Sequence, residues 1–136
     1  MSTENVAVVC RWFHEVWNQR RPETIDELMA ADAVCEGEGK PITGPKEFRA
    51  RFYDPLTSAF TRTPVELEVV ICQGEDVVVR WSSTATHDGP GLGVPASGKQ
   101  VTMRGITRMR VRGGKLIEGW QSSNLDEVVR GLTAVS

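Results

Sequence analysis

The segment VELEVVICQGEDVVVRWSSTAT, residues 65–86, decides the fold of this chain. Both halves are rich in valine and isoleucine, which favour extended strands. The connection Gln73-Gly74-Glu75-Asp76 separates them. We therefore predict two neighbouring antiparallel strands, Val65–Cys72 and Val77–Thr86.

Two more strands follow, at Gln100–Val111 and Lys115–Ser123. The turn Arg112-Gly113-Gly114 between them suits a hairpin, because glycine accepts the positive φ that such turns need. Side chains alternate between the two faces of a strand. One face of the third strand should therefore form a core or pocket wall, with Val101, Met103, Gly105, Thr107, Met109 and Val111. Its arginines, Arg104, Arg108 and Arg110, should face solvent or a partner subunit.

The first half of the chain reads as helical. Apolar residues recur at helical spacing from Val6 to Trp17, and we expect this helix to end near Asn18. Pro22 fits the first turn of a short second helix. A third helix should begin at Pro45 and bend or end near Tyr53–Asp54, because Pro55 cannot continue it without a kink.

Short segments complete the order of elements. We predict a strand at Ala33–Glu36, a glycine-rich loop at Gly37–Gly44, a long loop at Asp88–Lys99 and a C-terminal helix from Asn124 or Leu125. Helices followed by sequential antiparallel strands give an α+β architecture. A strongly curved sheet of this kind leaves a cone-shaped space, where small ligands bind.

Composition limits the class of protein. The 136 residues are 40% apolar and 25% charged, which predicts one globular domain, residues 1–136. A net charge of −2 argues against nucleic-acid binding. No segment has the roughly 20 apolar residues of a membrane span, and the N-terminus has no signal-peptide pattern. The odd, widely spaced cysteines predict neither a disulfide framework nor a metal site, and favour a reducing cytoplasm.

Three stretches of the sequence resemble one family. Asn5–Asp26 resembles the opening helix of SnoaL-like polyketide cyclases and ester cyclases, which have the nuclear transport factor 2-like fold. Thr86–Gly89 with Gly93–Val101 resembles the central loop of that family, and Arg112–Trp120 its final hairpin. The resemblance implies a cystatin-like α+β barrel with a cone-shaped pocket, no cofactor, and a homodimer or higher homo-oligomer.

The resemblance also implies catalytic positions. Family members that close polyketide rings carry an acid/base aspartate four residues after a tryptophan, with a histidine nearby. Here Trp120 matches the tryptophan and His87 the histidine, but the fourth residue after Trp120 is Asn124. Asparagine cannot take a proton at neutral pH. Asn124 could hold an oxyanion by hydrogen bonding, or it could cap the helix that follows.

The other candidates come from the residues themselves. His87 suits proton transfer, although a histidine at a strand end can simply bond the loop backbone. A partly buried glutamate has a raised pKa, which suits a catalytic base, so Glu36 is a candidate. Glu38 and Asp88 compete with it, and any of the three could be a solvated loop carboxylate.

Substrate contacts are predicted on the same faces. Trp81 shares a strand face with Ser83 and His87, and Trp120 shares one with Ser122. Trp81 and Trp120 could stack on an aromatic substrate, while Ser122 could bond it. The alternation places Met103 on the pocket wall, and Tyr53 could bond a ligand from a helix end or lie at the surface.

The functional hypothesis is a cofactor-independent cyclase or isomerase that acts on a polyketide-like or other natural-product intermediate. Its partner would be a small molecule, with no nucleic acid or membrane involved. Two alternatives stay open: a non-catalytic module for ligand binding or dimerisation, and a hydrolase or isomerase for a small lipophilic substrate. The glycine-rich run Gly89–Gly93 links two strands and opens no helix, so it is no dinucleotide fingerprint.

Overall fold

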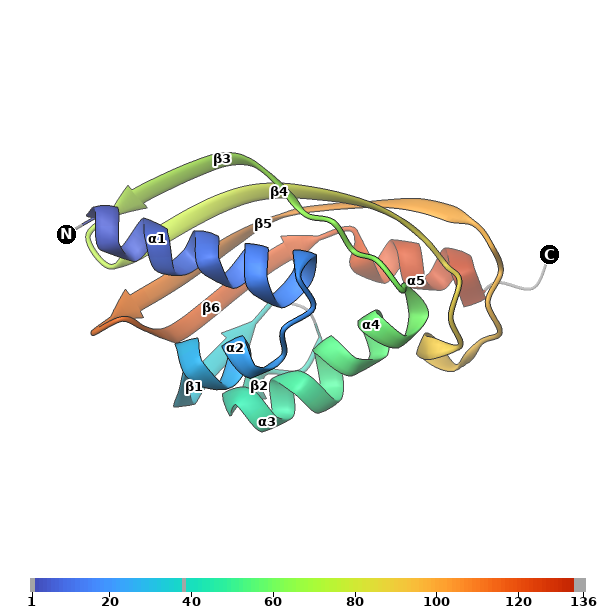
Figure 1. The fold of residues 1–136 in the computed structure, drawn as a ribbon, viewed down its shortest axis with the longest axis horizontal. Coiled ribbons are helices and arrows are strands. Elements are labelled where there is room, and N and C mark those ends of the chain that lie inside the picture. The colour runs from blue at the N-terminus through green and yellow to red at the C-terminus, as the bar shows by residue number, and fades with distance from the viewer. Residues whose placement is uncertain (1, 38, 134–136) are drawn as a thin grey trace.

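The computed structural model describes residues 2–37 and 39–133 as a curved six-stranded sheet with helices on its concave face (Figure 1). The strand order is β2-β1-β6-β5-β4-β3, antiparallel throughout except for β1 and β6, which pair in parallel. Strands β2 and β3 form the edges, so the cone is a curved sheet that remains unclosed. The strands are β1 (Met29–Glu36), β2 (Ile42–Thr43), β3 (Glu66–Gln73), β4 (Asp76–Thr86), β5 (Gln100–Arg112) and β6 (Lys115–Ser123).

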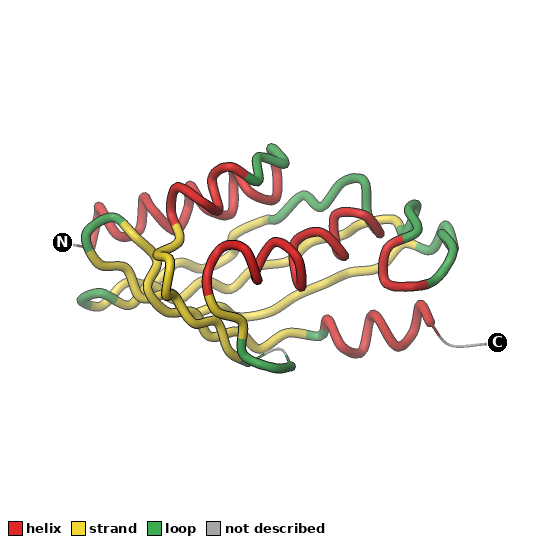
Figure 2. Tube along the Cα trace, turned by 90° about the horizontal axis from the view of Figure 1, so that it is seen from below, coloured by secondary structure: helices red, strands yellow, loops and turns green. Residues whose placement is uncertain are grey.

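The helices lie in two groups beside the sheet. Helix α1 (Ser2–Trp12) continues as a π-helical stretch over Phe13–Asn18 and is followed by α2 (Glu23–Leu28). Helix α3 (Gly44–Phe48) continues through a π-helical stretch, Arg49–Tyr53, into α4 (Asp54–Ala59). Both groups lie on the same side of the strands, while α5 (Leu125–Thr133) follows β6 near the C-terminus (Figure 2).

The third helix differs from its prediction. It neither bends sharply nor ends at Tyr53–Asp54, but runs on to Ala59. The π-helical stretch already shifts the hydrogen-bond pattern there, and Pro55 falls in the first turn of α4, where its missing N–H costs least.

The first strands also differ. Strand β1 begins at Met29 rather than Ala33, and Ile42–Thr43 forms a short strand inside the predicted Gly37–Gly44 loop. Strand β1 is held by β6, which is distant in the sequence, and β2 pairs with the nearby end of β1. The four long strands begin and end within a residue of their predicted bounds.

The concave face carries the core, and the alternation predicted for β5 is confirmed. Met103, Thr107, Met109 and Val111 are all buried, as are Val77 and Val79 of β4 beside them. Burying apolar side chains is the main favourable term in folding, so this face sets the position of the helices. They cover it with buried residues that include Val9, Val16, Ile25 and Phe48.

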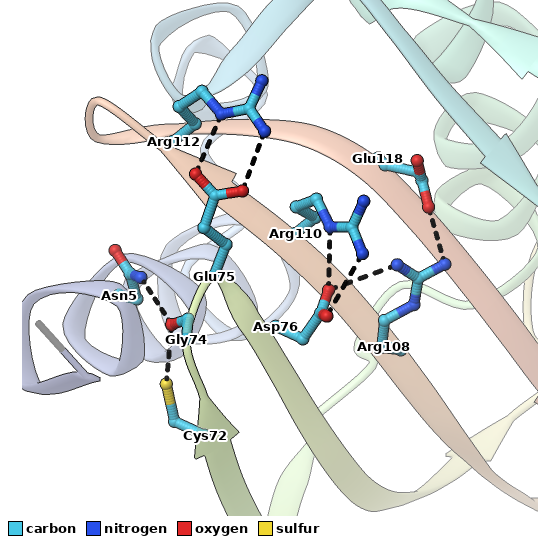
Figure 3. A network of polar contacts seen from close by, with 9 residues as sticks. All are labelled: Asn5, Cys72, Gly74, Glu75, Asp76, Arg108, Arg110, Arg112 and Glu118. Atoms are coloured by element: carbon cyan, nitrogen blue, oxygen red, sulfur yellow. Dashed lines mark hydrogen bonds and ion pairs between the residues drawn. The ribbon is translucent and has the colours of Figure 1, made fainter.

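The convex face is charged instead. Asp76 bonds Arg108 and Arg110, Arg108 also bonds Glu118 at 2.7 Å, and Arg112 bonds Glu75 at 2.8 Å (Figure 3). The arginine row therefore lies on the outer face, as expected from the alternation. Two large hydrophobic side chains, Ile71 and Ile106, are exposed on the same face.

Candidate functional site

A cavity of about 110 Å³ lies between the concave face of the sheet and the helices. It is lined mainly by apolar and aromatic side chains, and all four tryptophans of the chain contribute: Trp12, Trp17, Trp81 and Trp120. A cavity of about 150 Å³ can hold benzene. The enclosed part of this pocket is smaller than that, so it suits at most one small ring whose remaining atoms extend into the mouth.

The helical wall is a cluster of aromatic rings in contact. Trp12 meets Phe48 edge-on, with ring centroids 5.3 Å apart, and Trp17 meets Phe52 in the same way at 5.9 Å. Phe48 and Phe52 lie 5.2 Å apart on the helix, four residues from each other. Edge-on contacts of this kind stabilise a fixed arrangement of rings, so the wall is preorganised.

The sheet wall holds a chain of hydrogen bonds across β4, β5 and β6. Trp81 Nε1–H donates to Thr107 Oγ1 at 2.9 Å, and that hydroxyl donates to Gln121 Oε1 at 2.7 Å. Gly105, opposite Trp81 in the register, leaves room for the indole, because a Cβ there would lie 2.9 Å from Trp81 Cζ2. This series of hydrogen bonds holds the Trp81 indole in place, so that one face of the ring points toward the cavity.

Ser83 and Thr63 add two more hydroxyls to the lining. Thr63 Oγ1 donates to the backbone oxygen of Trp17 at 3.4 Å. Ser83 is 4% exposed, and its Oγ has no hydrogen-bond partner among the described residues. Met103 lies directly opposite Ser83 on β5 and also lines the cavity, as predicted for a pocket wall.

The two carboxylates of the lining lie at its rim. Glu36 is exposed at the end of β1, next to Trp120 in the parallel register, and Trp120 is 44% exposed. The second carboxylate, Glu118, is bonded to Arg108. The sites predicted at Glu36 and Trp120 therefore lie together at the pocket mouth, while Trp81 forms part of its inner wall.

Cys35 is the remaining ionisable residue of the lining. Burial raises the pKa of its thiol to about 11. At neutral pH the thiol is therefore uncharged, and since the thiolate is the nucleophile, Cys35 acts here as a small apolar group.

His87 is fully buried but is not among the described residues that line the cavity. The backbone N–H of Ser97 donates to His87 Nδ1 at 3.3 Å, and Ser97 Oγ lies 2.9 Å from the same nitrogen. This network assigns the ring proton to Nε2, which finds no partner among the described residues. The ring packs against Phe60, and the backbone of His87 bonds Gly98 and Lys99. His87 therefore anchors both ends of the loop between β4 and β5.

Asn124 is also placed beside the pocket rather than in its lining. Its Oδ1 accepts from the backbone N–H of Arg104 at 2.8 Å, and its Nδ2 donates to the backbone oxygen of Thr102 at 3.0 Å. The amide thus extends the β5–β6 ladder past its last residue. At the start of α5, the backbone N–H of Leu125 donates to the side-chain Oγ of Ser123.

The remaining predicted residues lie apart from the cavity lining. Tyr53 is buried, with its hydroxyl donating to the backbone oxygen of Val16 at 3.3 Å, and burial raises its pKa. It is thus a core residue, and the surface alternative is wrong. Ser122 is exposed and lies beside Ile106 in the register, on the convex face. Asp88 bonds Thr61, whose hydroxyl and N–H lower the pKa of that carboxyl, while Glu38 lies outside the described residues.

Sequence reasoning missed three polar groups of the wall as site residues: Ser83, Thr107 and Gln121. The signal was present for two of them. Alternation had placed Ser83 on the same face as Trp81, and Thr107 among the apolar residues of β5. Gln121 could not be assigned in this way, because an irregularity in the β5–β6 register shifts the faces of β6.

A second hollow lies at the other end of the sheet, beside the start of α1. Its polar groups are already bonded to each other, since Asn5 and Cys72 both donate to the backbone oxygen of Gly74 and Arg112 bonds Glu75 (Figure 3). In the described part of the chain, no cluster of three or more His, Cys, Asp or Glu residues could hold a metal ion. Nor is any helix within these residues long and apolar enough to cross a membrane.

Solved structures resemble the whole chain. A candidate SnoaL-like polyketide cyclase from Jannaschia sp. CCS1 is 29% identical, with a TM-score of 0.88 over 100% of this chain and 96% of its own. A candidate hydroxylase from Streptomyces galilaeus is 21% identical, with a TM-score of 0.85 over 100% and 89%. A protein from Catenulispora acidiphila with a ketosteroid isomerase-like fold, solved with trimethylamine, is 17% identical, with a TM-score of 0.68 over 84% and 82%.

The last two likenesses show the fold alone, which is that of the nuclear transport factor 2-like proteins. No curated protein matches the sequence. The model of one family, described as SnoaL-like polyketide cyclase, matches residues 7–132. The chain belongs to the SnoaL-like polyketide cyclase family.

Proposed function

We propose that this protein binds a polyketide-like or related natural-product intermediate in its pocket and promotes ring closure or isomerisation by proton transfer, without a cofactor. The observation that carries the proposal is the aromatic-lined cavity, in a chain that belongs to a cyclase family. An apolar cavity with a few placed polar groups suits a neutral, flexible ligand. Holding one folded conformer brings the reacting carbons together, which contributes several kcal/mol to the rate.

The proposed chemistry is an intramolecular aldol reaction. A base removes a proton from a carbon between two carbonyl groups, and the resulting enolate attacks a further carbonyl carbon of the same chain. The new carbon–carbon bond leaves an alkoxide, which takes a proton back. The reaction needs an acid/base group and donors for the developing oxyanion, and no other reactant.

We assign the base to Glu36. It is the lining carboxylate without an ion-pair partner among the described residues, whereas Glu118 is bonded to Arg108. His87 remains the alternative, because its Nε2 is unpaired, but its ring would have to reach the cavity from outside the lining. Asn124 and Ser122 are left out of the chemistry, since the amide of Asn124 is bonded to β5 and Ser122 lies on the convex face.

The test uses tetraketide and pentaketide thioesters of N-acetylcysteamine as probes, since these are long enough to close a six-membered ring by the aldol step. Products are separated by chromatography and weighed by mass spectrometry. Ring closure gives a product of unchanged mass, or one lighter by a molecule of water. Glu36→Gln should lower turnover about a hundredfold or more, while Glu118→Gln should leave it near the wild-type value. A product heavier by one oxygen atom would point to hydroxylation and overturn the proposal.

Non-catalytic ligand binding is the second candidate. It is favoured by the position of Asn124 and His87, since the residues matching the family's acid/base pair lie outside the cavity lining. In that case the thioesters would bind without being converted, and Glu36→Gln would leave their dissociation constants unchanged.

We further propose a homodimer that packs the convex faces of two sheets together. Ile71 and Ile106 are exposed on this face beside charges of both signs, so two copies facing each other could match apolar and charged groups. Sedimentation should show a dimer that Ile106→Glu converts to a monomer. A monomeric wild-type protein would rule the dimer out.

A further inference from the structure

The hydroxyl of Ser83 is a polar group without a partner inside an apolar pocket. Among the described residues, three buried side-chain atoms lack a hydrogen bond: Arg20 Nε, His87 Nε2 and Ser83 Oγ. Of these residues, Ser83 is the one that lines the cavity. Its side chain lies between Trp81 and Ala85 on the inner face of β4, opposite Met103.

An unpaired buried hydroxyl lowers the free energy of unfolding. A buried hydroxyl that loses its bonds to water and gains none in the protein destabilises the folded state, whereas alanine would fill nearly the same space without that cost. Buried polar groups in folded proteins are almost always paired. A partner that arrives with the ligand explains an unpaired hydroxyl at this place.

The other polar groups of the wall do not need a ligand in the same way. Trp81 Nε1–H is bonded to Thr107, the Thr107 hydroxyl to Gln121, and the Thr63 hydroxyl to the backbone. The described lining residues include no lysine, arginine or histidine. A carboxylate or phosphate would therefore enter the cavity without a countercharge, which is unfavourable in an apolar environment.

We propose that the Ser83 hydroxyl donates a hydrogen bond to a neutral carbonyl oxygen on a ring-sized apolar group of the ligand. This bond selects ligands that carry an oxygen at that depth and fixes how far the group enters. The inference rests on the proposed function only in taking the cavity as the ligand site, and needs no turnover.

The test compares acetophenone with ethylbenzene, which share a ring and a two-carbon side chain and differ in the carbonyl oxygen. Binding is followed by NMR of ¹³C-methyl methionine, because Met29, Met103 and Met109 line the cavity and Met103 lies opposite Ser83. Ser83→Ala should weaken acetophenone binding about fivefold to tenfold and leave ethylbenzene unchanged. Benzoate, which is anionic, should not shift these methyl signals.

Ser82→Ala is the matched control, since Ser82 precedes Ser83 but points to the other face, where its hydroxyl donates to Glu68. It should change neither dissociation constant. Equal weakening of both ligands by Ser83→Ala, or of neither, would overturn the proposal.

Thermal unfolding supplies a second readout. If the hydroxyl is unpaired in the free protein, Ser83→Ala should melt at the wild-type temperature or above it. A lower melting temperature would mean that the hydroxyl already has a structural partner, and the proposal would fail. The two proposals can fail separately. If the thioesters are not cyclised but Ser83→Ala still weakens only acetophenone binding, the enzyme activity is wrong and the role of Ser83 is retained.

Discussion

The two faces of the sheet are formed by the same strands but differ in how their polar side chains are paired. On the convex face, Asp76 lies between Arg108 and Arg110, and each of the three charges has a partner of opposite sign. On the concave face of the same strands, Ser83 lies among apolar and aromatic groups with no partner among the described residues. The ion pairs form where water could have solvated the charges, whereas the Ser83 hydroxyl has no partner although water is scarce around it.

This difference predicts which face of the sheet has the larger effect on stability and on ligand binding. Exposed ion pairs contribute little, because water already solvates both charges. A buried polar group has a larger effect in either direction, since its surroundings cannot replace a missing bond. The concave face should therefore dominate both stability and ligand binding, and the predictions below compare substitutions on the two faces.

The largest difference is expected between two tryptophans. Trp81 is 6% exposed on the inner wall, and Trp81→Ala should lower the free energy of unfolding by about 3–5 kcal/mol, because it leaves a cavity and removes the bond to Thr107. Trp120 is 44% exposed, and Trp120→Ala should cost about 1–2 kcal/mol. Urea denaturation measures both. Equal losses would contradict the contrast between the buried inner wall and the exposed pocket mouth.

The next effect concerns His87. His87→Leu replaces the ring with an apolar side chain of similar size and removes the acceptor for the Ser97 N–H, so stability should fall by about 1–3 kcal/mol. Hydrogen exchange should rise at the amides of the loop between β4 and β5. If the thioester probes are turned over at the wild-type rate, His87 has no part in the chemistry; a hundredfold loss would restore it as the acid/base group.

A smaller effect is expected on the convex face. Asp76→Asn removes the partner of Arg108 and Arg110 and should cost about 0.5–1 kcal/mol at pH 7, less in high salt. Hydrogen bonds from Arg110 and Arg108 hold the pKa of Asp76 below its usual value of 3.8. Its contribution is therefore present above that value and lost as pH falls through the lower folded-state pKa. The two proteins should converge in stability in acid, and a persistent gap would contradict the assignment.

The smallest effect is chemical rather than energetic. Because burial raises the pKa of Cys35 to about 11, iodoacetamide should alkylate this thiol slowly at pH 8. Labelling should speed up as pH approaches that pKa, and peptide mapping identifies the residue. An occupied pocket should slow it further, whereas rapid labelling at pH 8 would mean that Cys35 is exposed. Cys72, outside the lining, serves as the control.

The sequence predicted the four long strands because their alternation and turns are local signals. It did not predict the parallel pairing of β1 with β6, which joins segments some 80 residues apart. For the site, alternation identified Trp81 and Met103 as wall residues. It could not show that a backbone ladder holds Asn124 or that the loop encloses His87, since both depend on contacts formed only in the folded chain.

The tryptophans give the pocket an optical consequence. Since all four indoles of the protein line one cavity, its tryptophan fluorescence comes entirely from the ligand site. A ligand that displaces water there should change the emission of the whole protein, with no label attached. Trp120, at the mouth, should be open to a soluble quencher such as iodide, while Trp12, Trp17 and Trp81 should be shielded. The protein thus carries a reporter that distinguishes a ligand held at the rim from one that has entered.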